Sequence, residues 1–456
     1  MTKLFGTDGI RGVAGEAPLD ARTIFAVGRA VGEFLRGAGN TSGKVLLGED
    51  TRESSPWVSG YLAGGLRAAG VECVSAGVLP TPGVAQLVRR DQFAAGLMVS
   101  ASHNPYRDNG IKLIGANGMK LPDETEAHIE ERIHALLVPP AAGLGSNLAP
   151  QEQKPPVEPG LAEEYIELLR GAVAGLDLSG LRLVVDCANG AASQVAPELL
   201  RRLGAQVTPI HAAPDGKNIN LDCGALHPEA LAAKVKEVGA EAGVAFDGDA
   251  DRAMLVSSTG RVVDGDGVLL AAARWMKDNG TLKGGTVIGT VMANQGLEVA
   301  LREAGLALVR TAVGDRYVLE EMLRRGANLG GEQSGHVIFL DDSPAGDGLL
   351  TALKMLRIVR ERGASLDELT ADLKVFPQVL KNVRVREKPP LEQLPAVQQA
   401  IREAEAALGE RGRVVVRYSG TEPLLRVMVE AESQADVDRW TGEIADAVDK
   451  AVGSDG

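Results

Sequence analysis

The stretch AGVAFDGDADR (242–252) opens with a short apolar run and ends in aspartates at every second position. An apolar run of this length, bounded by polar residues, indicates a buried strand. Two other stretches have the same plan, AAGLMVSASHNP (94–105) and ANLGGEQSGH (327–336). The sequence therefore predicts three buried strands that each lead into a loop of polar side chains.

Similar strand–helix–strand segments precede all three stretches. The first strands are expected at 44–48 (KVLLG), 181–186 (LRLVVD) and 286–289 (TVIG). Helix ends that pass through a glycine into a second strand are expected at 66–74 (LRAAGVECV), 200–210 (LRRLGAQVTPI) and 301–309 (LREAGLALV). Glycine just past a helix end is typical of a left-handed cap. Strands that alternate with helices favour parallel sheets covered on both faces.

We therefore expect three tandem α/β domains with mixed, mostly parallel sheets, although chance similarity among strand–helix units is an alternative. Ligands bind beyond the carboxyl ends of the strands in such sheets. The three polar loops are thus expected to meet in one central cleft.

The end of the chain has a different pattern. Two strands are expected at 412–420 (GRVVVRYSG) and 424–432 (LLRVMVEAE), followed by a helix with one apolar face,. This pattern predicts a small C-terminal α+β domain, attached by a hinge near 374–381. The expected domain boundaries are 1–155, 156–255, 256–372 and 373–456.

Composition excludes several classes of protein. Of 456 residues 45% are hydrophobic, which excludes general disorder, and no apolar run reaches the roughly 18 residues that span a bilayer,. A net charge of −13 and 3% aromatic residues disfavour a nucleic-acid binder,. Cys73, Cys187 and Cys223 have no metal-site spacing, so we expect small buried side chains in a reduced, cytoplasmic protein,.

The first polar loop contains Ser102, His103, Asn104 and Pro105. Asn-Pro favours a turn, which would place the Ser102 hydroxyl on a loop directly after a strand. Such a serine could act as a nucleophile or phosphate carrier, with His103 and Lys112 nearby. An ordinary polar turn is the alternative.

The second loop contains Asp247, Asp249 and Asp251, followed by Arg252. On an extended segment these three carboxylates would point to one side, where they would repel each other unless a cation neutralised them. Oxygen ligands favour Mg²⁺ or Ca²⁺. An EF-hand is excluded because its sixth and twelfth positions would be Arg252 and Ser258,. We expect Mg²⁺, and an acidic surface turn is the alternative.

The remaining two loops suit sugar and phosphate. Glu332, Ser334 and His336 could hydrogen-bond to hydroxyl or amine groups. The loop after 412–418 offers hydroxyls and backbone N–H groups between two arginines, which suits a phosphate dianion. Its candidate residues are Arg417, Ser419, Gly420, Thr421 and Arg426. Each loop could also be an ordinary polar turn.

Together the motifs resemble those of the α-D-phosphohexomutase superfamily. They occur in the order GTDGIRG (6–12), SASHNP (100–105), DNGIK (108–112), DGDADR (247–252), GEQSGH (331–336) and RYSGTEP (417–423). Gln333, where mannose- and glucose-phosphate enzymes usually carry Met, makes the chain most similar to the bacterial members that act on glucosamine phosphates. Tyr418 departs from the proline common in the last loop, and we expect altered loop stiffness without lost function.

The resemblance implies a mutase that interconverts glucosamine 6-phosphate and glucosamine 1-phosphate. Ser102 would be phosphorylated and would ligate one Mg²⁺ together with the three aspartates. Glu332, Ser334 and His336 would bind the sugar, and the C-terminal loop would bind the phosphate that is not transferred. The implied cations and proton-transfer groups around the reacting phosphate are Arg11, His103, Lys112 and Arg252.

The resemblance also implies a 1,6-bisphosphate activator, a phosphorylated hexosamine substrate and a homodimer. The composition predicts no nucleic-acid or membrane partner,. Three alternatives remain: a mutase of the same superfamily acting on mannose or glucose phosphates, a phosphatase with Asp247 as nucleophile, and a non-catalytic sensor.

Overall fold

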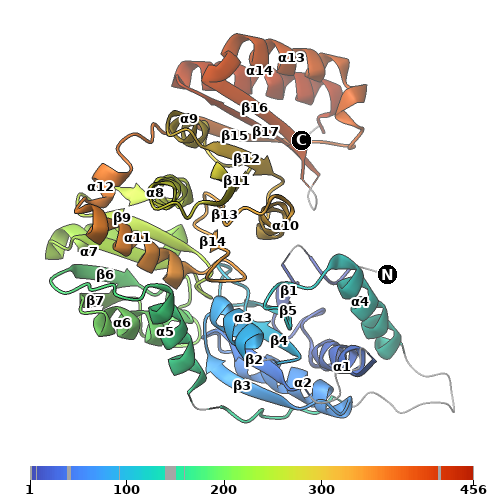
Figure 1. Ribbon diagram of the computed structural model, residues 1–456. Coiled ribbons are helices and arrows are strands. Elements are labelled where there is room, and N and C mark those ends of the chain that lie inside the picture. The colour runs from blue at the N-terminus through green and yellow to red at the C-terminus, as the bar shows by residue number, and fades with distance from the viewer. Residues whose placement is uncertain are drawn as a thin grey trace.

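A computed structural model shows three α/β units followed by a smaller α+β unit, arranged in sequence along an arc (Figure 1). The predicted fold class is confirmed. The residues described are 3–6, 8–37, 43–91, 93–138, 150–158, 160–419 and 423–454. Within these ranges, the helices are all too short or too polar to cross a membrane.

The first unit is built on a five-stranded sheet of order β1-β5-β4-β2-β3. Its strands are β1 (Ile10–Val13), β2 (Val45–Glu49), β3 (Cys73–Val78), β4 (Ala95–Val99) and β5 (Asp108–Gly115). Its helices are α1 (Ala21–Gly37), α2 (Ser55–Ala68), α3 (Thr81–Arg90) and α4 (Asp123–Leu137). Strand β2 pairs in parallel with β3 and β4, and β5 pairs antiparallel with both β4 and β1.

The second unit repeats this plan in a sheet of order β10-β9-β8-β6-β7. Its strands are β6 (Arg182–Asp186), β7 (Gln206–Ile210), β8 (Ala242–Phe246), β9 (Ala253–Ser257) and β10 (Val262–Val263). Its helices are α5 (Leu161–Ala172), α6 (Ala192–Arg202) and α7 (Glu229–Val238), with a 3-10 turn at Gly224–Leu226.

The third unit has a four-stranded sheet of order β12-β11-β13-β14. Its strands are β11 (Thr286–Thr290), β12 (Ala307–Thr311), β13 (Leu329–Gly331) and β14 (Val337–Phe339). Its helices are α8 (Gly265–Asp278), α9 (Gln295–Glu303), α10 (Asp315–Arg325), α11 (Gly348–Arg362) and α12 (Leu366–Leu369), with a 3-10 turn at Lys283–Gly285.

In each of the three sheets, β2, β6 or β11 lies between the next two strands of its unit and pairs with both in parallel, and the strand after those two is antiparallel. The predicted glycine caps are confirmed, because Gly70, Gly204 and Gly305 have φ values of 75°, 96° and 68°. The repeated topology brings the loops after β4, β8 and β13 to the same position in each unit.

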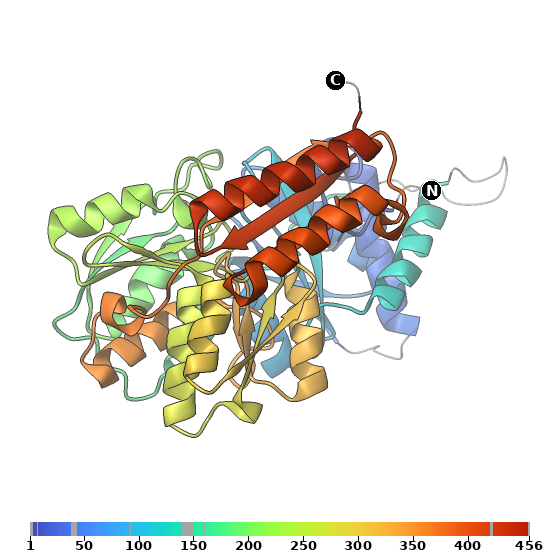
Figure 2. The same ribbon diagram turned by 90° about the horizontal axis from the view of Figure 1, so that it is seen from above.

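The C-terminal unit is an antiparallel sheet of order β15-β17-β16 with α13 and α14 on one face (Figure 2). Its elements are β15 (Gln378–Arg384), α13 (Pro395–Leu408), β16 (Gly412–Tyr418), β17 (Leu424–Ala431) and α14 (Gln434–Val452), with 3-10 turns at Leu391–Gln393 and Gly409–Arg411. The two predicted strands and the helix are present. The hinge expected at 374–381 is wrong from Gln378 onward, because β15 pairs with β17 along its whole length.

The buried apolar side chains show which units are joined. One large cluster runs from α3 of the first unit through α5 and α6 to α8 and α11, so the first three units share a core. The C-terminal unit has a separate core, in which Val437, Trp440 and Ile444 of α14 pack against β17. Hydrogen bonds still join it to the third unit, because Arg413 donates to the carbonyls of Val291 and Ala293 at 2.7 and 2.6 Å and Glu430 accepts from the N–H of Gln295 at 2.9 Å.

Candidate functional site

The loop after β4 holds Ser102 in a strained, buried position. Its φ is 52°, in the left-handed region that non-glycine residues rarely adopt, and it is 2% exposed,. Its N–H donates to Ser100 Oγ at 3.0 Å, and His103 Nδ1 lies 3.3 Å from its hydroxyl. Such a conformation persists only where its surroundings determine it.

Arg52, which follows β2, supplies part of that restraint. Its guanidinium is fully buried and its Nε donates to Asp50 Oδ2 at 2.8 Å. The two terminal nitrogens donate to the carbonyl oxygens of Ser102, Asn104 and Pro105 at 3.0, 2.9 and 2.5 Å. Sequence analysis missed Arg52 because a buried arginine cannot be distinguished from a surface arginine by its sequence.

Asn220 of the second unit also hydrogen-bonds to this loop. Its Nδ2 donates to the carbonyls of Ser102 at 2.9 Å and Asn104 at 3.1 Å. Together with Arg52, this amide fixes the positions of the Ser102 and Asn104 carbonyls. It also joins the first unit to the second at the loop that contains Ser102.

The aspartate loop follows β8 as a tight turn, so the expectation of an extended segment is wrong. Strand β8 ends at Phe246, and Ala250 has a φ of 55°, which curls the backbone. The three carboxylates still converge, with one oxygen from each within 4.8 Å of the others. A side chain at Gly248 would place its Cβ 2.5 Å from the Ser102 carbonyl oxygen, so only glycine allows this approach.

Ser102 meets this loop directly. Its Oγ donates to Asp247 Oδ2 at 2.5 Å, and both side chains are buried. Burial, followed by repulsion from Asp251 and Asp249, raises the pKa of Asp247 well above its ordinary range,. The structure therefore brings the predicted nucleophile and the predicted metal ligands together.

The carboxylates fit a hard divalent cation. The Oδ1 atoms of Asp249 and Asp251 are buried and accept no hydrogen bond from any described residue. A buried carboxylate oxygen without a donor is costly unless a cation occupies the space it faces. An all-oxygen donor set suits Mg²⁺.

Lys112 on β5 neutralises the outer side of the cluster. Its Nζ lies 2.9 Å from Asp249, 3.1 Å from Asp8 and 3.4 Å from Asp251. Burial lowers the pKa of Lys112, but the three carboxylates outweigh this effect and raise the pKa well above its usual value. Thr81 Oγ1, at the start of α3, donates to Asp249 Oδ2 at 2.5 Å. Asp8 and Thr81 were not predicted, because neither lies in a polar loop after a strand.

A pocket of about 610 Å³ adjoins these groups and draws on the first three units. Its lining includes predicted site residues from all three, namely Arg11, His103, Asp251, Arg252, Glu332 and His336. Burial, followed by repulsion from Arg252 and Arg11, lowers the pKa of His103 to about 4, so its imidazole is neutral near pH 7. The expectation that the three loops share a cleft is confirmed.

The loop after β13 contributes Glu332 and His336 to this pocket. Glu332 Oε1 accepts from the N–H of Gly314 at 3.1 Å, and His336 Nδ1 lies 3.7 Å from Asp251 Oδ1. Burial lowers the pKa of His336, but Asp251 outweighs it and raises the pKa to about 9. Ser334 does not line the pocket, and its buried Oγ has no hydrogen-bond partner among the described residues.

Two of the candidate phosphate residues, Arg417 on β16 and Arg426 on β17, do not line this pocket. The antiparallel register places Arg417 directly opposite Arg426. Burial, followed by repulsion from Arg426, lowers the pKa of Arg417. Like charges opposite each other weaken a sheet, and an anion between them would relieve the repulsion. Lys388 Nζ donates to the Ser419 carbonyl at 2.6 Å, whereas Gly420 and Thr421 lie outside the described residues.

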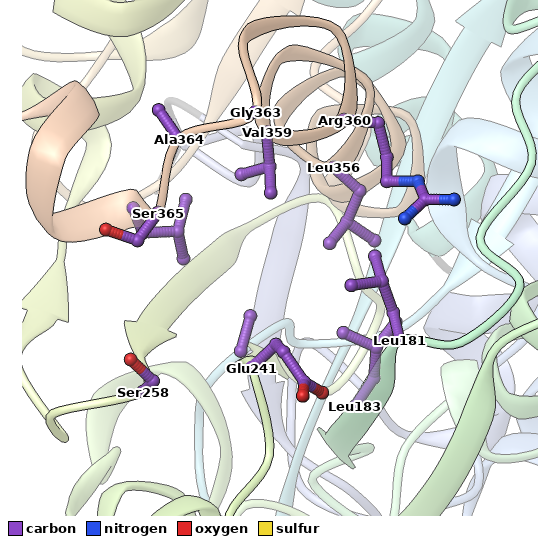
Figure 3. Close-up of a pocket in the computed structure, with 12 residues that line it drawn as sticks. Leu181, Leu183, Glu241, Ser258, Leu356, Val359, Arg360, Gly363, Ala364 and Ser365 are labelled. Atoms are coloured by element: carbon purple, nitrogen blue, oxygen red, sulfur yellow. The ribbon is translucent and has the colours of Figure 1, made fainter.

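A second pocket, of about 310 Å³, lies where α11 and the following turn pack over the starting ends of β6 and β8 (Figure 3). Leu181, Leu183, Leu356 and Val359 line much of it. This pocket has no nucleophile–metal pair and lies at the opposite ends of the strands from Ser102 and the aspartates.

Comparison with known proteins agrees with this architecture. Family models for the α/β/α domains I, II and III and the C-terminal domain of phosphoglucomutase/phosphomannomutase match residues 2–137, 163–260, 264–376 and 380–447. The chain belongs to this family of phosphohexomutases.

Two phosphoglucosamine mutases and one solved structure are among the individual proteins that the chain resembles. The chain is 52% identical to a phosphoglucosamine mutase of Koribacter versatilis, over 99% of this chain and 98% of the relative. It is 53% identical to a phosphoglucosamine mutase of Solibacter usitatus, over 99% of each chain. The crystal structure of a phosphoglucomutase/phosphomannomutase family protein from Burkholderia thailandensis superimposes with a TM-score of 0.78 at 28% identity, covering 99% of this chain and 98% of that one.

Proposed function

We propose that the protein interconverts glucosamine 6-phosphate and glucosamine 1-phosphate, and so supplies UDP-N-acetylglucosamine and cell-wall synthesis. The observation that carries the proposal is the contact of 2.5 Å between Ser102 Oγ and Asp247, at the centre of a carboxylate cluster suited to a divalent cation. The full-length similarity to phosphoglucosamine mutases supports the choice of sugar.

In this proposal Ser102 carries the phosphoryl group. The phosphoserine transfers it to O1 of glucosamine 6-phosphate, which gives a 1,6-bisphosphate and free Ser102. After the bisphosphate turns around, its 6-phosphoryl group returns to Ser102 Oγ and glucosamine 1-phosphate leaves. The same bisphosphate, added from solution, would phosphorylate Ser102 initially and so act as the activator.

Charge stabilisation dominates phosphoryl transfer, because little other chemistry is required of the protein. Asp247, Asp249, Asp251 and an oxygen at Ser102 would hold Mg²⁺, which supplies positive charge at the transferring phosphoryl group. Arg11 and Arg252 would add positive charge from the pocket side.

The hydroxyl that attacks the phosphoserine must lose its proton to a nearby base. His103 and Lys112 are the candidates closest to Ser102 and the aspartates. His103 has the form that a base requires, because its lowered pKa keeps the imidazole neutral at pH 7,.

The rest of the site would bind and orient the sugar phosphate. Glu332, Ser334 and His336 would contact the hydroxyl and amine groups, whichever end of the sugar faces Ser102. Arg417, Ser419, Gly420, Thr421 and Arg426 would bind the phosphate that is not transferred. In this proposal the C-terminal unit closes over the pocket during the reaction, which would bring its phosphate-binding residues toward the sugar and exclude water.

The proposal includes four domains at 1–155, 156–255, 256–372 and 373–456, a cytoplasmic location and a homodimer. The homodimer follows from the family resemblance, and the cytoplasmic location follows from three cysteines without a disulfide pattern,.

Four measurements test the proposed function. Peptide mapping should find phosphate on Ser102, and Ser102→Ala should reduce mutase turnover by more than about a thousandfold. Removing divalent cations should abolish turnover, and Mg²⁺ should restore it. A kcat/KM for mannose 6-phosphate equal to or above that for glucosamine 6-phosphate would reject the assigned sugar, and substantial turnover by Ser102→Ala would reject the covalent carrier.

A further inference from the structure

A second group of metal-ligating side chains lies in the second unit, apart from the aspartate loop. Asp186 ends β6, His211 directly follows β7, and Cys223 precedes the turn that leads to α7. Their carboxylate oxygen, ring nitrogen and sulfur atoms lie within 4.8 Å of one another. The three residues are far apart in the sequence, so no local motif predicts that they form a cluster.

Two of the three groups are buried. Asp186 is 0% exposed, and its carboxylate accepts from the N–H groups of Ala188 at 2.9 Å and Gly224 at 3.1 Å. Cys223 is 1% exposed, and its thiol makes no hydrogen bond to any residue that the structure describes. A buried, unpartnered sulfur directed at a buried carboxylate is an arrangement that a cation would stabilise.

His211 forms the accessible side of the group. Its ring is about one-third exposed, at 32%, and its Nδ1 lies 2.9 Å from Asp186 Oδ2. Ligand atoms bound to one tetrahedral Zn²⁺ are roughly 3.3–3.8 Å apart, given metal–ligand distances of about 2.0–2.3 Å. Nδ1 and Oδ2 would therefore have to separate by about 0.4 Å to admit a metal, and the Cys223 sulfur, which lies within 4.8 Å of both, would have to lie about 3.6 Å from each,.

We propose that Asp186, His211 and Cys223 form a binding site for a borderline-soft divalent cation such as Zn²⁺, with solvent as the fourth ligand. The donor set of one sulfur, one imidazole and one carboxylate distinguishes it from the all-oxygen aspartate cluster, which favours Mg²⁺.

Binding at this site must release a proton. Burial, with a contribution from Asp186, raises the pKa of the Cys223 thiol to about 12, so the thiol is protonated at neutral pH. The metal–sulfur bond forms as the S–H bond breaks and its proton passes to solvent. His211 then offers the Nδ1 lone pair to the metal and carries its own proton on Nε2. Affinity should therefore increase with pH.

Co²⁺ is a suitable probe, because a thiolate–cobalt bond gives a near-ultraviolet charge-transfer band that carboxylates cannot give. The background is an Asp249→Asn protein, which weakens the aspartate cluster and leaves all three cysteines intact. We expect one equivalent of Co²⁺ to produce the band and Zn²⁺ to remove it. Calorimetry in buffers of different ionisation enthalpy should show about one proton released per metal.

Variants assign the band to this site. Cys223→Ser should abolish it, whereas Cys73→Ser and Cys187→Ser should retain it. His211→Asn, which still tolerates the left-handed φ of 45°, should weaken Zn²⁺ binding by more than about tenfold,. A circular-dichroism melt of each variant controls for folding. No band in the parent protein, or an unchanged band in Cys223→Ser, would overturn the proposal, and neither result bears on the mutase activity.

Discussion

Replacing Asn220 by glycine tests whether the second unit positions Ser102, the proposed phosphate carrier of the first unit. Asn220 has a φ of 57°, so alanine would add backbone strain to the loss of the amide. Glycine accepts this conformation without strain. Asn220→Gly therefore removes two hydrogen bonds, to the carbonyls of Ser102 and Asn104, and leaves the local backbone conformation accessible.

The size of the effect follows from these two bonds. A hydrogen bond of this kind contributes about 0.5–1.5 kcal/mol, so the pair contributes about 1–3 kcal/mol. If that energy holds Ser102 in its reactive position, kcat should decrease by about 5- to 150-fold, since about 1.4 kcal/mol corresponds to a factor of ten. KM should change less, because Asn220 does not line the pocket.

Steady-state mutase kinetics, with the phosphorylation of Ser102 measured by intact mass, separate the two effects. Leu221→Gly is a matched control at the adjacent position, where the side chain is 64% exposed. A kcat within twofold of wild type for Asn220→Gly, at equal phosphorylation, would refute the positioning role.

Three further predictions concern neighbouring contacts. Gly248→Ala forces the aspartate loop away from Ser102, and a shift of about 1 Å should reduce kcat roughly a hundredfold in the mutase assay; wild-type kcat would contradict the close approach,. Arg52→Met leaves Asp50 without its buried partner and should destabilise the first unit by about 3–5 kcal/mol in urea unfolding, with the exposed Arg67→Met as the control; equal midpoints would contradict it,. Asp347 has its pKa raised to about 6 by burial, so its native state binds the proton more tightly and stability should decrease as the pH rises from about 4 to 6,. Asp347→Asn should flatten the thermal stability profile over that range, and a profile unchanged from wild type would refute this assignment.

Much of the fold could be predicted because its pattern is local. Each first strand is a short apolar run, and each helix ends at a glycine such as Gly204, whose conformation the structure confirms. Strand β15 was missed because most of its residues are exposed or half-buried at the sheet edge, so it lacks the apolar signal of the other strands.

The site was predictable as far as its residues lie in motifs. Ser102 and the three aspartates stand in loops after strands, and the repeated topology brings those loops together. Thr81 and Asn220 were not predictable, because their contacts join the first unit to the second. Arg52 was not predictable either, because its contacts to Ser102, Asn104 and Pro105 form only once the first unit has folded. The turn at Ala250 was also not predictable, because aspartates at every second position are compatible with either a strand or a turn.

The division of labour among the repeated units has a consequence for evolution and engineering. The proposed phosphate carrier, Ser102, lies in one unit and the carboxylate cluster in the next, while the groups proposed to bind the hexose lie in a third. Substitutions within 331–336 could therefore change which sugar is bound. The residues proposed to transfer the phosphoryl group belong to other sheets and would keep their positions. During evolution, such an enzyme could change its sugar specificity and retain the same phosphoryl-transfer reaction.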